Sequence, residues 1–438
     1  MDDVTRAVQA LIDKQVTYDN LWAYYDGIQP LRYSTKRLAE IFRGLDARFT
    51  QNWCEVVVNS ALERIEVEQL VVPGDSDASA TETLWWNGSG LDIDADDVHL
   101  CALVTGEAFV IAWPSAEGAM EAYYNDSRLA HVFYDSERPR ENRFAAKWWD
   151  SDDGARLTLY YPDRLFYFGS SKARKEIRNA KQFQPLGDLI EGAESEAPNP
   201  LGIVPVFHFR RETRGIKSEL SPSLLDMQDS INKLLADMMV AAEFGAFKQR
   251  YVISAMDTGT LKNAPNEIWN LAAGDGLMQD TEVGEFAETN LGNFMTQVQD
   301  LAVAMAKISR TPQSYFFLGA RADPSGEALA AMESALVKKC EKYIKRFGRE
   351  WRTLLATVRN AAPIPTFADP RTTQPFTQAQ TRQMNVSAGI PLKTQLRREG
   401  WTEPELAQLD ADAQAAQAAQ AETLAQAMLN QQRAFDGA

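Results

Sequence analysis

The stretch SPSLLDMQDSINKLLADMMVAAEFGAFKQRYV, residues 221–252, decides the fold of this chain. Its apolar residues recur at nearly heptad spacing: Leu224, Met227, Ile231, Leu234, Met238 and Ala242. Such a stripe is typical of a helix that packs lengthwise against another helix. Ser221-Pro222 is a suitable start, because Ser can cap free backbone amides and Pro is tolerated in the first turn.

A second helix of similar length is predicted over 288–309. It repeats the spacing in Leu291, Phe294, Val298, Leu301, Met305 and Ile308. Between the two helices, residues 248–287 break the pattern with Gly274-Asp275-Gly276, which indicates a turn in a small β-containing insert. The middle of the chain is therefore expected to be two paired helices with an insert at one end.

The N-terminal half combines helices and strands. Apolar spacing predicts helices through most of residues 1–65 and a strand at 66–72, ended by Pro73-Gly74. Residues 100–210 are rich in Val, Phe, Tyr and Trp and are expected to be mostly extended, with a hairpin turn at 152–154 and an acidic loop at 187–200. The predicted strands are Phe109–Trp113, His131–Tyr134, Arg143–Trp149, Ala155–Tyr161, Arg164–Gly169 and Ile203–Phe209.

The C-terminal part returns to helix. After a loop at 310–323, Asp323-Pro324 begins a helix of about 35 residues, a rod of roughly 50 Å. Its apolar stripe comprises Leu329, Met332, Leu336, Cys340, Tyr343, Phe347, Trp351, Leu354 and Val358. A Pro-rich linker at 363–375 and short helices with an Ala/Gln-rich run follow. The fold class is α+β and mainly helical.

Composition limits the possible functions. The 438 residues are 45% hydrophobic and 24% charged, which is typical of a globular protein with two or three structural units. The net charge of −16 argues against a protein that coats nucleic acid, since such proteins neutralise phosphates with Lys and Arg. Three dispersed cysteines, no signal-peptide pattern and no apolar run of roughly 18–20 residues favour a soluble protein in a reducing compartment.

No catalytic motif is evident. The three histidines are dispersed, and His208, within a predicted apolar strand, is interpreted as structural; HExxH, CxxC, P-loop and GxSxG patterns are absent. The acidic pairs Asp92/Asp94 and Asp96/Asp97 are better explained by a solvated loop than by a cation site. The sequence therefore predicts a non-enzymatic structural protein with no cofactor and no metal.

Basic residues gather on the long helix at Lys338, Lys339, Lys342, Lys345, Arg346, Arg349 and Arg352. They could face phosphate. The opposite stripe is apolar, so a solvated or subunit-facing side is the preferred interpretation.

Several motifs, in order along the chain, resemble the SPP1-type portal family of tailed bacteriophages, which is common in actinobacteriophages. The motifs are YYDGIQPL (24–31), NWCEVVVNSALERIEVE (52–68), NPLGIVPVFHFRRE (199–212), the stretch at 221–252 and DPSGEALAAMESALVKKCEKYIKRFG (323–348). Each is only moderately specific, but their joint occurrence over about nine-tenths of the chain indicates the family.

The resemblance implies a portal fold assembled as a dodecameric ring at one capsid vertex. The ring would be the channel for DNA packaging, retention and ejection. The implied regions are a wing at 1–220, stem helices at 221–247 and 288–309, a clip at 248–287, a tunnel loop at 310–323, a long wing helix and linker at 324–375 and a crown at 376–438. The implied partners are other copies of the chain, double-stranded DNA, the terminase large subunit, a head-completion or adaptor protein, and major capsid and scaffolding proteins. The implied location is the virion, after assembly in the host cytoplasm.

The channel residues are predicted from these positions. Acidic residues outnumber basic ones on the first stem helix, so its polar face would be a mildly repulsive wall for DNA; each added cation would instead increase affinity for phosphate. The predicted channel set is Asp226, Asp229, Lys233 and Asp237 on this helix, with Lys307, Arg310, Gln313, Tyr315 and Arg321 around the tunnel loop. For Tyr315, Phe316 and Phe317, packing between subunits is preferred over DNA contact.

Two other classes of protein compete with a channel. A nuclease acting on packaged DNA would need a metal-binding cluster of carboxylates or histidines, and none is evident. An internal scaffolding or adaptor protein would be shorter or built of simple helices throughout, without the β-rich block.

Overall fold

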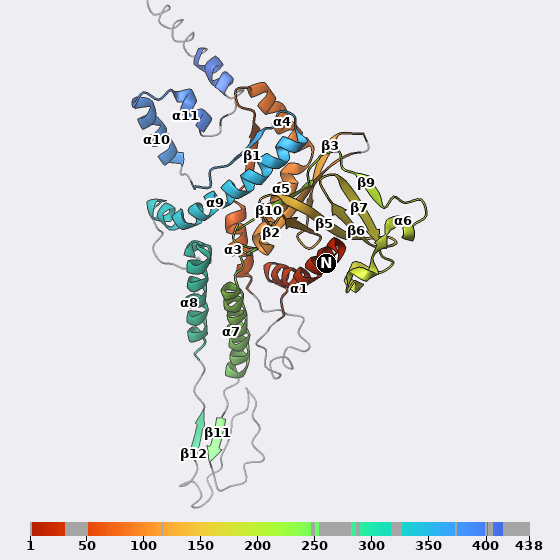
Figure 1. Cartoon of the computed structure of the whole chain (residues 1–438). Coiled ribbons are helices and arrows are strands. Elements are labelled where there is room, and N and C mark those ends of the chain that lie inside the picture. Colours follow the sequence, from red (N-terminus) through yellow and green to blue (C-terminus); the bar gives the residue numbers. More distant parts are fainter. Residues whose placement is uncertain are drawn as a thin grey trace, which may run out of the picture. The chain divides into compact units, whose positions relative to one another are not determined.

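The computed structural model describes residues 2–30, 51–115, 117–246, 250–253, 282–285, 290–316, 326–372, 375–398, 401 and 406–414 (Figure 1). The chain divides into two compact units. One comprises Met1–Pro73 and Ala78–Pro370, and the other comprises Gly74–Asp77 and Arg371–Ala438. Helices and strands are mixed, as predicted. No helix of the described residues is long and apolar enough to cross a bilayer.

The main core of the first unit lies where four helices meet a small sheet. The helices are α1 (Asp3–Tyr25), α3 (Trp53–Leu62), α5 (Leu91–Thr105) and α9 (Gly326–Val358). Helix α4 (Ser76–Gly88) adds Trp86, whose ring meets Trp351 edge-on with centroids 5.1 Å apart. Large apolar side chains buried from segments far apart in sequence thus hold the unit together.

The stripe predicted on the long helix is confirmed over most of its length. The residues from Leu336 to Val358 in that stripe are buried. Leu329 and Met332, in contrast, are 36% and 53% exposed, so the first turns of α9 extend beyond the core.

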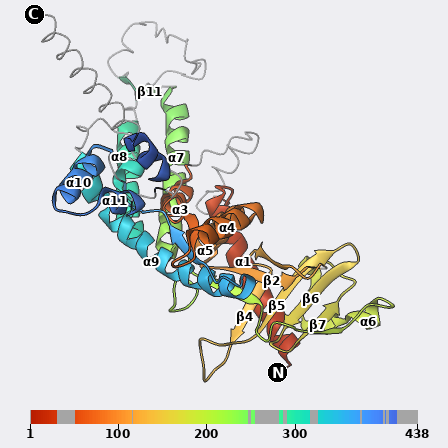
Figure 2. The same ribbon diagram turned by 90° about the horizontal axis from the view of Figure 1, so that it is seen from above.

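Two larger antiparallel sheets form the β-rich block. The smaller of the two has the order β10-β2-β3, with β2 (Glu107–Pro114) between β10 (Val206–Arg210) and β3 (Met120–Asn125). The larger has the order β4-β5-β6-β7-β8, with β9 also paired to β7. Its strands are β4 (Ala130–Tyr134), β5 (Asn142–Ser151), β6 (Gly154–Tyr160), β7 (Arg164–Gly169), β8 (Gln184–Pro185) and β9 (Glu196–Pro198). Apolar residues of α1 pack on this sheet around Phe144 and Trp148, and Figure 2 shows α1 beside it.

The strands expected from 109 to 169 are confirmed within two residues at each end, and the turn at 152–154 joins β5 to β6. Strand β3 was not predicted. Its exposed positions are Glu121 and the aromatic Tyr123, so the alternation of burial is not matched by an alternation of polar and apolar residues in the sequence.

Several local predictions were wrong. The acidic pairs from Asp92 to Asp97 lie on helix α5, which continues to Thr105, so residues 100–105 are not extended. The loop at 187–200 contains the end of α6 (Leu186–Leu189) and strand β9, preceded by the short helices η1 (Arg174–Glu176) and η2 (Ala180–Gln182). The Pro-rich linker contains β13 (Ile364–Phe367), which pairs with β1 (Val67–Val71). Pro365 is accommodated because the sheet has only these two strands, both at its edges.

The predicted helix pair is present as α7 (Pro222–Ala246) and α8 (Leu291–Ser309), which lie side by side (Figure 1). Helix α7 begins at Pro222 as expected, but the buried Ser221 hydroxyl has no hydrogen-bond partner among the described residues, so it does not cap the helix. Asn290 does cap α8, by accepting from the Gly292 amide at 2.9 Å. Beyond them, β11 (Arg250–Ile253) and β12 (Glu282–Glu285) pair antiparallel, so the insert contains the expected β structure.

The second unit contains α10 (Pro375–Ser387), α11 (Leu392–Arg398) and a helical segment at 406–414. Asn385 donates to Gln395 at 3.1 Å, and Lys393 pairs with Asp410 at 2.5 Å. The predicted cap at Asp323 and nearly all of the Ala/Gln-rich run lie outside the described residues.

Candidate functional site

The helix pair α7–α8 is held by an apolar seam that also anchors the segment after α8. Leu224 and Ile231 of α7 pack with Val298, Ala302 and Met305 of α8 in one buried cluster. Trp53 of α3 and Phe316 join the same cluster. The seam therefore fixes which faces of the two helices remain free.

On α7, three of the four predicted channel residues share the free face. Asp226 is exposed, and the half-buried Lys233 and Asp237 form an ion pair one turn apart. Their spacing of seven and four residues puts them on one stripe opposite the seam. Asp229 lies on another side of the helix. It is buried, and the Tyr24 hydroxyl of α1 donates to it at 2.7 Å.

Asp229 is therefore a correction to the predicted channel set. Its carboxylate is used inside the subunit, where it ties α7 to α1, so it cannot present a charge to DNA. With 3.6 residues per turn, Asp229 lies on a different side of the helix from Asp226, Lys233 and Asp237, and this could have been deduced from the sequence. No local pattern indicated that the Tyr24 hydroxyl is its partner.

On α8, Lys307 and Arg310 are exposed at the C-terminal end. Arg310 ends the helix in the left-handed conformation, with φ 60° and ψ 30°, a conformation that side-chain-bearing residues rarely adopt. This conformation turns the chain sharply from the helix into the loop. Gln313 is exposed in the 3-10 turn η4 (Gln313–Tyr315) that follows.

The base of the loop is fastened to its own subunit. Arg64, two residues after the end of α3, donates to the Tyr315 hydroxyl at 2.7 Å, and both contact Glu333 of α9 at 3.1 Å. Phe316 meets Trp53 edge-on, with ring centroids 5.6 Å apart. Phe316 is thus buried within its own subunit, and Tyr315 is engaged by neighbours in its own chain. Packing between subunits at these aromatic residues stays a prediction. Phe317 and Arg321 lie outside the described residues.

A buried ionic hub joins the start of α7 and the end of α8 to the middle of α9. Glu219, just before α7, pairs with Lys339 of α9 at 2.6 Å and with Arg211 at 3.1 Å, and Tyr343 also donates to it. Lys339 also donates to the backbone carbonyl of Ser309 in the last turn of α8, at 2.8 Å. Lys339 is thus not on the solvated side of α9, unlike its exposed neighbour Lys338. The sequence pattern could not show which of the two lysines is buried, because both are long cationic side chains at adjacent positions.

A second buried polar network lies in the β-rich block. Glu107 contacts Lys14 at 3.2 Å, Tyr18 at 2.8 Å and His208 at 2.8 Å, and His208 exchanges a hydrogen bond with Tyr134 at 2.8 Å. Burial would raise the pKa of Glu107, but Lys14 and His208 lower it below its usual value. Burial lowers the pKa of His208. The network is largely buried and joins α1 to the three strands β2, β4 and β10, which fits the structural role expected for His208.

The described residues contain no group of three or more His, Cys, Asp and Glu side chains arranged to hold a metal ion. The described residues thus offer two long helices, whose exposed surfaces carry charged side chains together with Met239, Met295 and Ile308, an antiparallel pair of strands, and a firmly anchored loop base. Residues 13–421 of the chain match the family described as "Phage portal protein, SPP1 Gp6-like".

The chain belongs to the phage portal family.

Similar proteins carry the same name. The portal proteins of Mycobacterium phage D29 and Mycobacterium phage L5 are 25% and 26% identical to this chain over 314 and 320 residues, which is 67% of the chain in each case. The match spans 61% of the length of each of those relatives, less than two thirds. The family description and both names identify portal proteins, which are structural components of phages rather than enzymes.

A solved structure described as "Neck of empty GTA particle computed with C6 symmetry" is also similar. Its TM-score to this portal chain is 0.48 at 12% identity, over 81% of this chain and 90% of that chain.

Proposed function

We propose that this chain assembles into a dodecameric ring at one capsid vertex and that double-stranded DNA passes through the ring during packaging, retention and ejection. The family match over residues 13–421 carries the proposal. In this scheme the wing, stem, clip, tunnel loop and crown occupy the residue ranges predicted from sequence. The terminase large subunit docks at the clip, a head-completion or adaptor protein binds later, and capsid and scaffolding proteins surround the ring. The product is a virion component assembled in the host cytoplasm.

The helix pair supports the stem assignment. Two helices that share an apolar seam, with an antiparallel pair of strands in the insert between them, form a unit that can pack beside copies of itself in a ring. The outer stripe of α7 carries two carboxylates and one ammonium, and the outer face of α8 carries Asp300 and Lys307. If these faces line the channel, the wall has a slight excess of negative charge and holds phosphate weakly.

The proposed channel set is therefore Asp226, Lys233 and Asp237 on α7, with Lys307, Arg310 and Gln313 near the tunnel loop. Tyr315 is reassigned to positioning the loop, because its hydroxyl is held between Arg64 and Glu333. Arg321 stays in the set as a prediction from sequence.

Negative-stain microscopy of the purified full-length chain tests the ring. Rings with a central hole are expected. A monodisperse monomer that cleaves DNA when a divalent metal is added would refute the portal proposal and favour a nuclease.

Binding of a short DNA duplex to the purified rings tests the channel residues. Lys307→Glu with Arg310→Glu should weaken binding and make the dependence of log K on log salt shallower, by about one unit for each phosphate that these side chains no longer neutralise. Lys338→Glu with Lys342→Glu on α9 makes the same change of charge at exposed positions away from the helix pair. Equal effects of the two pairs would remove Lys307 and Arg310 from the channel.

A further inference from the structure

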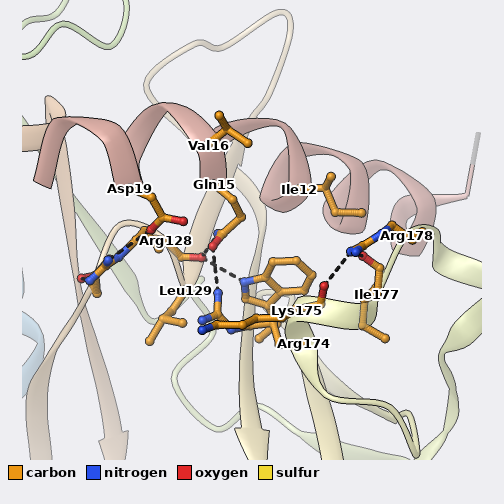
Figure 3. A pocket seen from close by; sticks show the side chains of 12 residues that line it. Ile12, Gln15, Val16, Asp19, Arg128, Leu129, Arg174, Lys175, Ile177 and Arg178 are labelled. Carbon is orange, nitrogen blue, oxygen red and sulfur yellow. Dashed lines mark hydrogen bonds and ion pairs between the residues drawn. The ribbon is translucent and has the colours of Figure 1, made fainter. Parts of the chain in front are cut away.

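A pocket of about 670 Å³ lies between α1 and the β-rich block (Figure 3). Its walls come from one side of α1, from the chain around Leu129 and Trp148, and from the η1 segment at 174–178. Its apolar surface is Ile12, Val16, Leu129, Trp148 and Ile177. Val16 is 80% exposed, which is unusual for a branched apolar side chain on a helix that otherwise packs against a sheet.

The cations around this pocket fall into two groups. Arg128 is neutralised by Asp126 at 2.8 Å and Asp19 at 3.2 Å. Arg174 lies over the Trp148 ring, with Asp150 3.6 Å away.

Lys175 and Arg178 differ from those two arginines. Both are exposed, and no carboxylate pairs with either of them among the residues that the structure describes. The Arg178 guanidinium donates to the backbone carbonyls of Lys175 and Ile177, at 2.6 and 3.1 Å, which holds it at the rim (Figure 3). The pocket thus presents an apolar hollow beside two unneutralised cations, on a chain whose net charge is −16.

The complementary surface is on α5 of the same chain. Ile93 is 69% exposed, and Asp96 and Asp97 follow it at three and four residues, on the same helix face. No cation pairs with Asp96 or Asp97 in the described ranges. Burial and then neighbouring carboxylates raise the pKa of Asp96, so this surface carries a repulsion that a cationic partner would relieve.

Helix electrostatics explain other acidic residues of α5 but not these two. Asp92 and Asp94 are in the first turn, where the positive end of the helix dipole favours carboxylates. Asp96 and Asp97 lie a turn further on, where that effect has faded.

We propose that Ile93 of one copy of this chain enters the α1–η1 pocket of the next copy, with Asp96 and Asp97 against Lys175 and Arg178. The Ile93 side chain would be buried beside Val16, and the carboxylates of Asp96 and Asp97 would pair with Lys175 and Arg178, the two cations that no carboxylate of the described residues neutralises. Because the pocket and the Ile93 stripe are different surfaces, the contact is heterologous, the kind that closes into rings. The inference rests on the proposed ring and assigns one of its subunit contacts.

The acidic segment at 188–196 is a poorer occupant. Its carboxylates are exposed, but its larger apolar residues Leu189 and Ile190 are half-buried within the same subunit. The α5 stripe, in contrast, combines an exposed large apolar side chain with carboxylates that no cation of the described residues neutralises.

Charge reversal tests the contact. Lys175→Glu with Arg178→Glu should weaken self-association of the full chain about tenfold or more, since like charges would face each other. Asp96→Lys with Asp97→Lys should do the same, and all four changes together should restore assembly to within a few-fold. Lys172→Glu with Lys181→Glu is the matched control, because both lysines are exposed near the pocket without lining it. Sedimentation velocity over a range of subunit concentrations gives the readout.

Disulfide trapping provides the geometric test. Val16→Cys combined with Ile93→Cys should give oxidised ladders of linked subunits on non-reducing gels, whereas Val16→Cys with Met332→Cys should not. The native Cys54, Cys101 and Cys340 are buried, and burial raises the pKa of Cys54 to about 12 and of Cys340 to about 11, which keeps the background low.

The outcomes separate this contact from the ring itself. The proposed contact would be overturned if rings form without the Val16–Ile93 cross-link and if neither charge reversal weakens their assembly. That result would leave the portal proposal intact, and an acidic helix of another protein would then be the better candidate for the pocket. A chain that stays monomeric at every concentration would overturn both.

Discussion

Replacing Lys339 with Met would remove an ammonium group that is buried where α7, α8 and α9 meet. The side chain of Lys339 is 8% exposed and that of Glu219 is 4% exposed, with 2.6 Å between the charged atoms. Removing one partner of a buried pair typically costs about 3–5 kcal/mol, because the other charge stays buried. Arg211 still contacts Glu219 at 3.1 Å, so we expect the lower part of that range. The Ser309 carbonyl also loses its donor, at a cost of about 1 kcal/mol.

We therefore expect Lys339→Met to lower the free energy of unfolding by about 3–4 kcal/mol. Urea unfolding followed by tryptophan fluorescence measures this loss, as a midpoint lower by roughly 1 M. Lys338→Met is the matched control. Lys338 pairs with Glu341 at 2.7 Å, and the two side chains are 69% and 35% exposed. This pair should contribute less than about 1 kcal/mol to the free energy of unfolding.

The effect should also depend on pH. Burial alone would raise the pKa of Glu219, but Lys339 and Arg211 lower it below its usual value. A lowered carboxylate pKa stabilises the folded state above the unfolded pKa, and that contribution is lost as the pH falls. The difference between the wild type and Lys339→Met should therefore narrow below about pH 4. Equal losses in Lys338→Met and Lys339→Met, or a difference that is independent of pH, would refute the hub.

Two further predictions concern the core and a turn. Burial lowers the pKa of His99 to about 3, and its imidazole accepts a hydrogen bond from the Trp351 indole N–H at 2.9 Å. The unfolded chain therefore protonates His99 at a higher pH than the folded chain does. The free energy of unfolding should fall as the pH drops from about 6.5 toward 3, by up to about 1.4 kcal/mol per pH unit. In His99→Gln that slope should be shallower when urea midpoints are compared across pH, and an unchanged slope would contradict this assignment. Gly154→Ala should lower the melting temperature far more than Gly192→Ala. Both glycines have positive φ, but only at Gly154 would the new Cβ lie 2.1 Å from a backbone atom, the Ser170 carbonyl oxygen. Similar decreases in the melting temperatures of the two variants would contradict this clash.

Local patterns along the chain were sufficient for the main elements. The heptad-like spacing from Leu224 onward predicted α7 and its pairing with α8, and the β-branched and aromatic runs predicted six strands of the β-rich block, the last of which begins three residues later than expected. These patterns involve residues close to one another along the chain, so they can be detected in the sequence alone. Patterns failed where a partner distant in sequence decides the outcome. Pro365 lies in a strand because β1, some 300 residues earlier, supplies the other edge.

The family, the helix pair and the excess of acidic residues on α7 could be determined from sequence alone, because ordered motifs, apolar period and residue charge are properties of the chain itself. Which charges remain free was decided by tertiary structure. Asp229 and Asp226 are the same residue type on one helix, yet Tyr24 buries the first and solvent meets the second. Lys339 and Lys338 are adjacent, yet Glu219 holds only the first inside the protein. A charge acts on DNA or on another subunit only if no neighbour has neutralised it, and those neighbours come from segments that folding brings together.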